Sequence, residues 1–308
     1  MSSNISLSYP NRIDECTVTS PSSWSAALPL ANVQDRVLQK VARTNTGVKT
    51  ALININLTAQ ARLIGCVALA NHNLSTSATV QFRGYSGPIV DGSPTGVLRF
   101  DSTANYFAWP VIYAADRGLI PWENKNFWRG TVEEDQRKSY THLAVYYAPS
   151  DQICKSVTIA ITDTSNADNY LEIGRIFLGR TVEPEYNPDY GDISQGYIDL
   201  TEIQRAVGTK YFYVQPKMRT LDILLKNLNQ TEALSGFYDA QREVGVSGEL
   251  LYAFSKPEYI SSANININMT TDKNFYARTF MANFAQLDPV TTAYFDGYST
   301  AIKLEEII

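Results

Sequence analysis

The sequence predicts a mainly β protein, in which a β-sandwich is followed by a smaller α+β domain of antiparallel strands with one helix. Short segments along the chain alternate apolar and polar residues, which is the period of a half-buried strand. The 308 residues include 19 Tyr, 12 Phe and 4 Trp, and aromatic side chains fit the pleated surface of a sheet. Because helical periodicity is rare in the first half of the chain, we expect the sandwich to be antiparallel.

The first half of the chain contains most of the predicted strands. In residues 51–57, Ile53, Ile55 and Leu57 fall on one face of an extended chain and two asparagines on the other. Residues 62–70 are a nearly continuous apolar run, which predicts a strand that is covered on both faces. The other strands of this half are predicted at 78–85, 142–147, 156–162 and 170–178.

A long excursion, predicted to be irregular, interrupts these strands at about residues 84–140. It contains Trp109, Trp122 and Trp128, and four prolines. Long loops in compact domains are usually functional or docked against the rest of the fold. The excursion therefore either folds back and covers the sandwich, or forms a contact surface for a neighbouring subunit or a ligand. Its three tryptophans are the candidate interface residues.

The chain divides best at a linker at residues 184–192, which has two prolines, a glycine and no apolar period. This boundary gives a sandwich domain at 1–183 and an α+β domain at 193–308. Residues 1–180 carry 16 basic and 14 acidic side chains, whereas 181–308 carry 10 and 17, so their net charges are +2 and −7. Oppositely charged halves are compatible with subunits that stack head to tail.

The second half contains the one predicted helix, at about residues 230–243. Asn229 lies three positions before Glu232, as in a capping box, and Gly245 lies just beyond the expected end. Residues 264–270 alternate strictly, and the outer asparagines of this strand mark a polar face or a paired edge. The other strands of this half are predicted at 217–227, 249–254, 275–284 and 300–306.

Composition and charge exclude several classes of protein. With 44% hydrophobic residues the chain can bury a core, so it is not a disordered chain. A net charge of −5 argues against a nucleic-acid partner, because binding the phosphate backbone requires a basic surface. No apolar segment is long enough to insert in a membrane. The N-terminus lacks the basic start and apolar run of a signal peptide.

Cysteine and histidine usage gives little support for chemistry. Cys16, Cys66 and Cys154 are far apart and odd in number, which is typical of free thiols rather than of a disulfide framework. The chain has two histidines, His72 and His142, and it lacks the nucleotide-binding, zinc-binding and Gly-x-Ser-x-Gly motifs. We therefore predict no enzyme, no catalytic residues, no metal and no cofactor.

One loop, residues 163–169, has oxygen ligands that could hold calcium. The spacing of a calcium-binding helix–loop–helix is absent, since position five is Ala167 and no Gly or distal Glu follows in register. An Asx-rich turn is the favoured interpretation.

Several segments together resemble a known family. Residues 67–86 (VALANHNLSTSATVQFRGYS), 119–130 (LIPWENKNFWRG) and 170–179 (YLEIGRIFLG) resemble the discoidin-like, galactose-binding-type β-sandwich, or jelly roll, of tail proteins from tailed bacteriophages. Residues 219–252 and 277–307 resemble the C-terminal part of the same proteins. The helix between strands is also similar to the hub domain of distal tail proteins.

This resemblance implies a structural virion protein that builds or decorates the distal tail or baseplate. Its partners would be copies of itself and the neighbouring tube, hub or fibre proteins, with sixfold or threefold symmetry. It would be made in the cytoplasm of the bacterial host and reside in the virion tail.

The alternative function is a carbohydrate-binding module that recognises host surface glycans. Discoidin-like domains place their ligand loops where Trp24 and Arg43 lie in this sequence, and His72 is expected in a nearby loop. An exposed tryptophan suits the apolar face of a sugar ring because its own face is apolar and planar. Trp24, Arg43 and His72 are therefore the candidate glycan contacts.

Overall fold

The chain folds into two compact units in a computed structural model. The structure describes residues 4–58, 60–112, 122, 140–206, 208–262, 265–270, 272, 274–294 and 297–308. Unit 1 comprises Met1–Thr181 and Leu251–Phe280, and unit 2 comprises Val182–Leu250 and Met281–Ile308. The described part of the chain is mainly β with antiparallel sheets and one longer helix, so the predicted fold class is confirmed.

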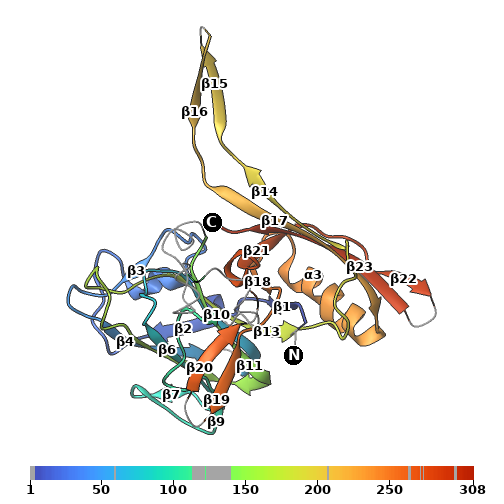
Figure 1. The fold of residues 1–308 in the computed structure, drawn as a ribbon. Helices are drawn as coiled ribbons and strands as arrows, with labels where there is room; N and C mark the ends of the chain where they lie inside the picture. Colours follow the sequence, from blue (N-terminus) through green and yellow to red (C-terminus); the bar gives the residue numbers. More distant parts are fainter. Residues whose placement is uncertain are drawn as a thin grey trace. The chain divides into compact units, whose positions relative to one another are not determined.

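Unit 1 contains a five-stranded antiparallel sheet (Figure 1). The centre of this sheet is β12, which pairs with β4 on one side and β6 on the other, with Ile159 opposite both Ile53 and Phe82. Across the sheet, the strands are β2 (Cys16–Thr19), β4 (Thr50–Leu57), β12 (Ser156–Thr162), β6 (Thr79–Tyr85) and β9 (Leu98–Asp101).

The second sheet of unit 1 includes strands from both ends of the chain. Its strands run in the order β11 (Leu143–Cys154), β5 (Arg62–His72), β13 (Glu172–Val182), β1 (Ser6–Tyr9) and β18 (Leu250–Ala253), and β3 (Ala42–Arg43) also pairs with β13. Leu7 on β1 lies opposite Tyr252 on β18. This pairing brings the segment after residue 250 into unit 1.

The core of unit 1 lies between these two sheets. Alternation on β4 and β12 places Ile53, Ile55 and Ile159 on the inner face of the first sheet, where all are fully buried. They belong to one apolar cluster with Leu69 on β5 and Ile176 on β13. Each such side chain contributes roughly 1.5–3 kcal/mol when it leaves water. The central residues of β5 are buried on both faces, which confirms the prediction for this run.

The described part of the excursion contains short strands, which corrects the prediction of an irregular segment. A small hairpin of β7 (Ile89–Val90) and β8 (Ser93–Pro94) is held by Asn56, whose amide bonds the backbone N and O of Ile89 at 2.7 and 3.1 Å. Further along, β10 (Val111–Ile112), β20 (Ile265–Thr270) and β19 (Glu258–Ser262) form a three-stranded sheet.

Asn268 on β20 connects the C-terminal part of unit 1 to the excursion. Its side chain is fully buried and bonds both the N and the O of Phe107, each at 2.8 Å. This asparagine therefore satisfies backbone groups of another segment, in addition to lying on a paired strand. A buried amide with two such partners is stable because none of these polar groups is left without a hydrogen bond.

Trp109 is the centre of an aromatic cluster. Its ring centroid lies 5.3 Å from His72, 5.0 Å from His142 and 5.4 Å from Tyr276. The indole is 3% exposed, and its Nε1 donates to the carbonyl of Leu74 at 3.0 Å. Trp109 thus anchors the middle of the excursion to the sandwich, because β5, the residue before β11 and the segment before β21 all supply contacts.

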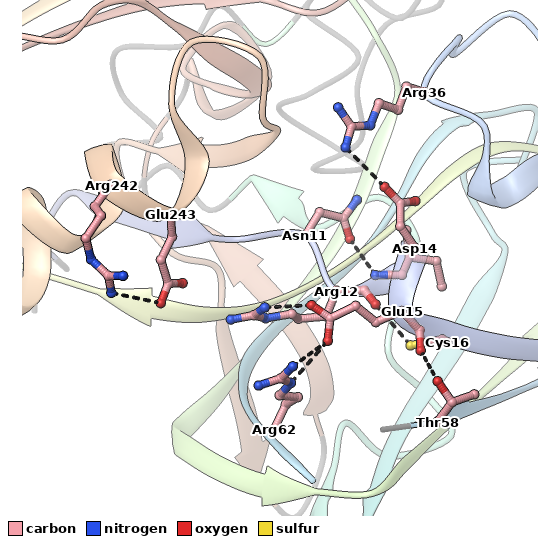
Figure 2. A network of polar contacts seen from close by, with 11 residues as sticks. Asn11, Arg12, Asp14, Glu15, Cys16, Arg36, Thr58, Arg62, Arg242 and Glu243 are labelled. Carbon is pink, nitrogen blue, oxygen red and sulfur yellow. Dashed lines mark hydrogen bonds and ion pairs between the residues drawn. The ribbon is translucent and has the colours of Figure 1, made fainter. Parts of the chain in front are cut away.

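A polar network fixes the short helix η1 (Ile13–Glu15) to the neighbouring strands (Figure 2). The Glu15 carboxylate accepts from Arg12 at 2.7 Å and from Arg62 at 2.8 Å. Burial raises the pKa of Glu15, but hydrogen bonds and charges from the two arginines outweigh it and lower the pKa below its usual value. The fully buried Arg175 pairs with Asp14 at 2.8 Å. The other short helices that the structure describes in unit 1 are η2 (Leu30–Gln34) and η5 (Phe275–Ala277).

The described part of unit 2 contains a larger antiparallel sheet, one helix and a separate two-stranded hairpin. The strands run in the order β21 (Thr279–Gln286), β23 (Gly297–Glu306), β17 (Lys217–Leu228) and β14 (Ile193–Asp199), and β22 (Thr291–Tyr294) also pairs with β23. Alternation on β17 buries Leu221, Ile223 and Leu225. Arg219 on β17 and Glu306 on β23 form a buried ion pair with an Nε–Oε2 distance of 2.7 Å.

The helix of unit 2 begins at a capping box, as predicted. The Glu232 N donates to the Asn229 side chain at 2.9 Å, and the Asn229 N donates to the Glu232 carboxylate at 3.0 Å. The helix continues as a π-helix over Glu232–Tyr238 (η4) and as an α-helix over Asp239–Val244 (α3). Gly245, with φ +57°, follows it.

The structure divides the chain differently from the prediction, which was a single break at 184–192 with domains at 1–183 and 193–308. The first passage between units lies between Thr181 and Val182, close to the predicted linker. The chain then returns, so Leu251–Phe280 belongs to unit 1. Local sequence patterns cannot reveal this return, because it depends on pairs such as Ser6 with Ala253, which are distant in sequence.

We predict that Trp109→Ala lowers the free energy of unfolding by about 3–5 kcal/mol, because it removes a large buried side chain and leaves a cavity. Trp122→Ala is the matched control, since Trp122 is 67% exposed and its truncation should change stability by less than about 0.5 kcal/mol. Urea denaturation of both variants measures the difference. Equal stability of the two variants would contradict the role given to Trp109.

Candidate functional site

Among the described residues, a protruding hairpin in unit 2 has the largest set of exposed aromatic side chains on neighbouring positions. Beyond the paired residues Asp199 and Lys217, residues 200–216 contain a two-stranded sheet of their own (Figure 1). We call this segment the arm; its strands are β15 (Glu202–Ala206) and β16 (Thr209–Tyr213).

Most of the described side chains of the arm are exposed to solvent. The exposed fractions are 55% for Ile203, 60% for Tyr211, 58% for Phe212, 65% for Tyr213 and 77% for Val214. An isolated two-stranded hairpin is marginally stable in water. Several exposed apolar side chains on neighbouring residues are typical of an interaction surface.

The register of the arm separates its side chains into two faces. Ile203 lies opposite Phe212. Arg205 lies opposite Lys210, two residues nearer the loop on each strand. Since residues two apart in a strand share a face, these four side chains form one face, apolar at its base and cationic near the tip. Tyr211 and Tyr213 belong to the other face.

Strand-forming residues and a glycine in the connecting loop explain why this segment forms a hairpin. The β16 sequence TKYFY is rich in β-forming aromatic residues. Gly208 in the connecting loop has φ +79°, a conformation that favours glycine. These local signals were available in the sequence, but they do not show that the hairpin projects from its unit.

A second candidate surface lies where loops of unit 1 meet β3 and β13. Arg43 on β3 pairs with the carboxylate of Glu172, the residue opposite it on β13. The Arg43 guanidinium also lies over the ring of Tyr170, 4.3 Å from its centroid. Trp24 is half-buried against the core and pairs through its backbone with Thr44, next to Arg43. We call Trp24, Arg43, Tyr170 and Glu172 the loop cluster.

Asn73 holds the loops of this cluster together. Its side-chain oxygen accepts from the Glu172 N at 2.8 Å, and its Nδ2 donates to Asp168 at 3.0 Å and to the carbonyl of Tyr170 at 3.1 Å. In the adjoining loop, Asp163 accepts from the N and Oγ of Ser75 at 2.7 and 2.5 Å. Asp163 thus fixes the backbone at Ser75. Within 163–169, the Asp168 N donates to the side-chain oxygen of Asn166 at 2.8 Å, which is the contact of the predicted Asx-rich turn.

The structure brings together two of the three predicted glycan contacts. Trp24 and Arg43 lie on adjacent segments, since the Ser25 N donates to the Arg43 carbonyl at 2.9 Å. His72 was expected in a loop, but β5 continues through it and its side chain is 2% exposed, packed against Trp109. Sequence reasoning missed Tyr170 and Glu172, because only the long-range register of β3 and β13 places them beside Arg43.

The three predicted interface tryptophans lie in different environments. Trp109 is buried within its own chain, whereas Trp122 is 67% exposed. Trp128, together with much of the excursion at 84–140, lies outside the described residues.

The three cysteine thiols are shielded from solvent. Cys16, Cys66 and Cys154 are free and buried, and burial raises the pKa of each thiol to about 12, so the thiols stay protonated at neutral pH. Among the described residues, no group of three or more His, Cys, Asp or Glu could hold a metal ion. None of the helices described is long and apolar enough to cross a membrane.

No model of a known protein family matches the sequence, and no curated protein matches it. Solved structures with a similar fold include chitosan-binding module 1 of a chitosanase/glucanase from Paenibacillus sp. IK-5, which is 13% identical with a TM-score of 0.36 and covers 55% of this chain and 98% of that chain. Another is the family 32 carbohydrate-binding module of NanJ from C. perfringens in complex with galactose, which is 13% identical with a TM-score of 0.33, covering 56% and 98%.

A third is a mutant of the lectin binding domain of Lectinolysin complexed with Lewis b, which is 11% identical with a TM-score of 0.34, covering 56% and 96%. These structures are carbohydrate-binding domains. Because their TM-scores are below 0.5, we argue the function of this chain from its own side chains.

Proposed function

We propose that this chain is a structural subunit of a phage tail, which builds or decorates the distal tail or baseplate through contacts with copies of itself and with neighbouring tail proteins. The single observation that carries the proposal is the arm, with its exposed Ile203, Tyr211, Phe212 and Tyr213. The family resemblance of the sequence supplies the tail context, and the carbohydrate-binding structures do not enter this argument.

The chemistry of the arm is that of a subunit interface. Tyrosine and phenylalanine are enriched in protein–protein interfaces, because they bury a large apolar area at a low cost in side-chain entropy. Burial of 55–65% exposed side chains such as Ile203, Phe212 and Tyr213 in a partner would stabilise both the contact and the hairpin itself. A subunit with such an arm would reside in the assembled virion.

We predict that replacing residues 200–216 by a two-residue Asn-Gly turn leaves unit 2 folded but prevents assembly. Asp199 and Lys217 already face each other at the base of the arm, so the turn closes a hairpin that exists. The readout is incorporation into tails, followed by immunogold electron microscopy of virions from the source of the chain. Incorporation at the wild-type level would contradict the proposal.

A pair of double variants controls for general effects of surface charge. Ile203→Asp with Phe212→Asp alters the arm, whereas Val246→Asp with Leu287→Asp alters exposed apolar residues elsewhere in unit 2. Only the first pair should reduce incorporation. If both pairs reduce it equally, the arm has no special role.

The loop cluster favours a second candidate function, recognition of host surface glycans. It combines aromatic rings with a guanidinium and a carboxylate that are fixed by neighbouring groups, and sugars are bound by stacking and by precisely placed polar groups. The Arg43 side chain is 38% exposed beside Tyr170 and Glu172, so it can contact a ligand. This function is compatible with a tail subunit that also contacts the host.

We predict that, if the loop cluster binds sugar, Trp24→Ala and Arg43→Ala each weaken saturable binding to host polysaccharide by at least about tenfold, as expected for loss of one well-placed contact. Isothermal titration calorimetry against fractions of host polysaccharide measures the binding. Trp122→Ala, which truncates an exposed tryptophan outside the cluster, should leave the affinity unchanged. Absence of saturable binding by the wild-type chain would remove this candidate.

A further inference from the structure

We infer that the arm docks on unit 2 of a second copy of this chain, against an acidic, partly aromatic surface at the start of its helix. This inference rests on the proposed function and names the partner of the arm. The receiving surface consists of Glu183, Glu185 and Tyr186 beside the first turn of the helix, and we call it the acidic patch.

The acidic patch lies beside the first turn of the helix because two segments of unit 2 are joined there. The Glu185 N donates to the Glu232 carboxylate at 2.6 Å, which ties the chain after β13 to the first turn of the helix. Gly236 on the next turn packs so closely on Val182 that an added Cβ would lie 3.0 Å from it. The side chains of Glu183 and Glu185 are exposed beside this junction.

The patch also exposes an aromatic side chain, since Tyr186 is 60% exposed. Ile203 and Phe212 on the first face of the arm match this ring, and Arg205 and Lys210 match the carboxylates.

Charge complementarity favours this surface over other parts of the chain. Outside the arm, residues 182–198 and 218–250 carry 3 basic and 9 acidic side chains, and 182–198 contains no Lys or Arg. The arm carries Arg205 and Lys210 against the single acid Glu202. Complementary charges steer two surfaces together and set their register.

The contact joins two different surfaces of identical chains. The arm side chains are exposed in the folded chain, with Phe212 at 58%, so the arm does not cover the patch of its own unit. A contact between an arm and a patch on another copy leaves one arm and one patch open, so it repeats into a ring or a filament.

The test uses charge-reversal variants of the full chain. Arg205→Glu with Lys210→Glu makes the arm acidic, and Glu183→Lys with Glu185→Lys makes the patch basic; all four side chains are exposed, so the fold should be kept, which circular dichroism checks. Each variant alone should lose at least about tenfold in self-association by sedimentation velocity, because like charges then face each other.

An equimolar mixture of the two variants should recover assembly, because each acidic surface then meets a basic one at both kinds of contact. A chain with all four substitutions should also assemble by itself. Lys40→Glu with Arg99→Glu is the control, since it makes the same change in net charge on exposed side chains of unit 1 and should leave association unchanged.

Other outcomes would overturn the inference. Wild-type association that survives both reversals, or is lost without recovery in the mixture, would place the arm on another surface. A wild-type chain that stays monomeric at all concentrations would exclude a second copy as the partner. The proposed function fails separately, when the chain without its arm still enters tails at the wild-type level.

Discussion

The burial of the inner faces of two sheets against each other is the interaction on which unit 1 depends. Ile53, Ile55 and Ile159 on one sheet share a single apolar cluster with Leu69 and Ile176 on the other. Once these faces are buried, the polar ends of the strands and their loops are held at fixed positions. The ion pair of Arg43 with Glu172 and the hydrogen bonds of Asn73 are consequences of this arrangement, because β3 and β13 are aligned by the sheet.

The arm in unit 2 shows the opposite arrangement of apolar side chains. Leu221, Ile223 and Leu225 on β17 are buried, but Ile203 and Phe212 on the hairpin beyond it remain exposed. Exposure of apolar side chains costs free energy in the isolated chain, and this cost is removed when a partner covers them. The arm therefore connects the physical chemistry of folding to the proposed role in assembly, and the glycan candidate concerns a separate surface in unit 1.

The sequence predicted the elements that depend on local patterns. Alternation identified β4 and β20, the continuous apolar run identified β5, and the Asn229–Glu232 pair identified the start of the helix. In each case the signal lies within a few residues of the feature, so that one sequence is enough to detect it.

Features that depend on distant pairing could not be predicted in the same way. The return of 251–280 to unit 1 follows from β1 pairing with β18, and the burial of His72 follows from the aromatic cluster around Trp109. Trp24 and Arg43, which were predicted at one loop end together with His72, lie on adjacent segments, whereas Tyr170 and Glu172 join them only through the register of β13. The arm has local strand and turn signals, but its projection depends on where β14 and β17 stop pairing.

Hydrogen–deuterium exchange of the full chain, measured at several protein concentrations, tests directly whether copies of the chain assemble through the arm. Self-assembly through the arm predicts that amides in 200–216, and those around the acidic patch at 183–190, exchange more slowly as concentration rises, while the core strands of unit 1 do not change. Arm amides that exchange at the same fast rate at every concentration would contradict self-assembly through the arm.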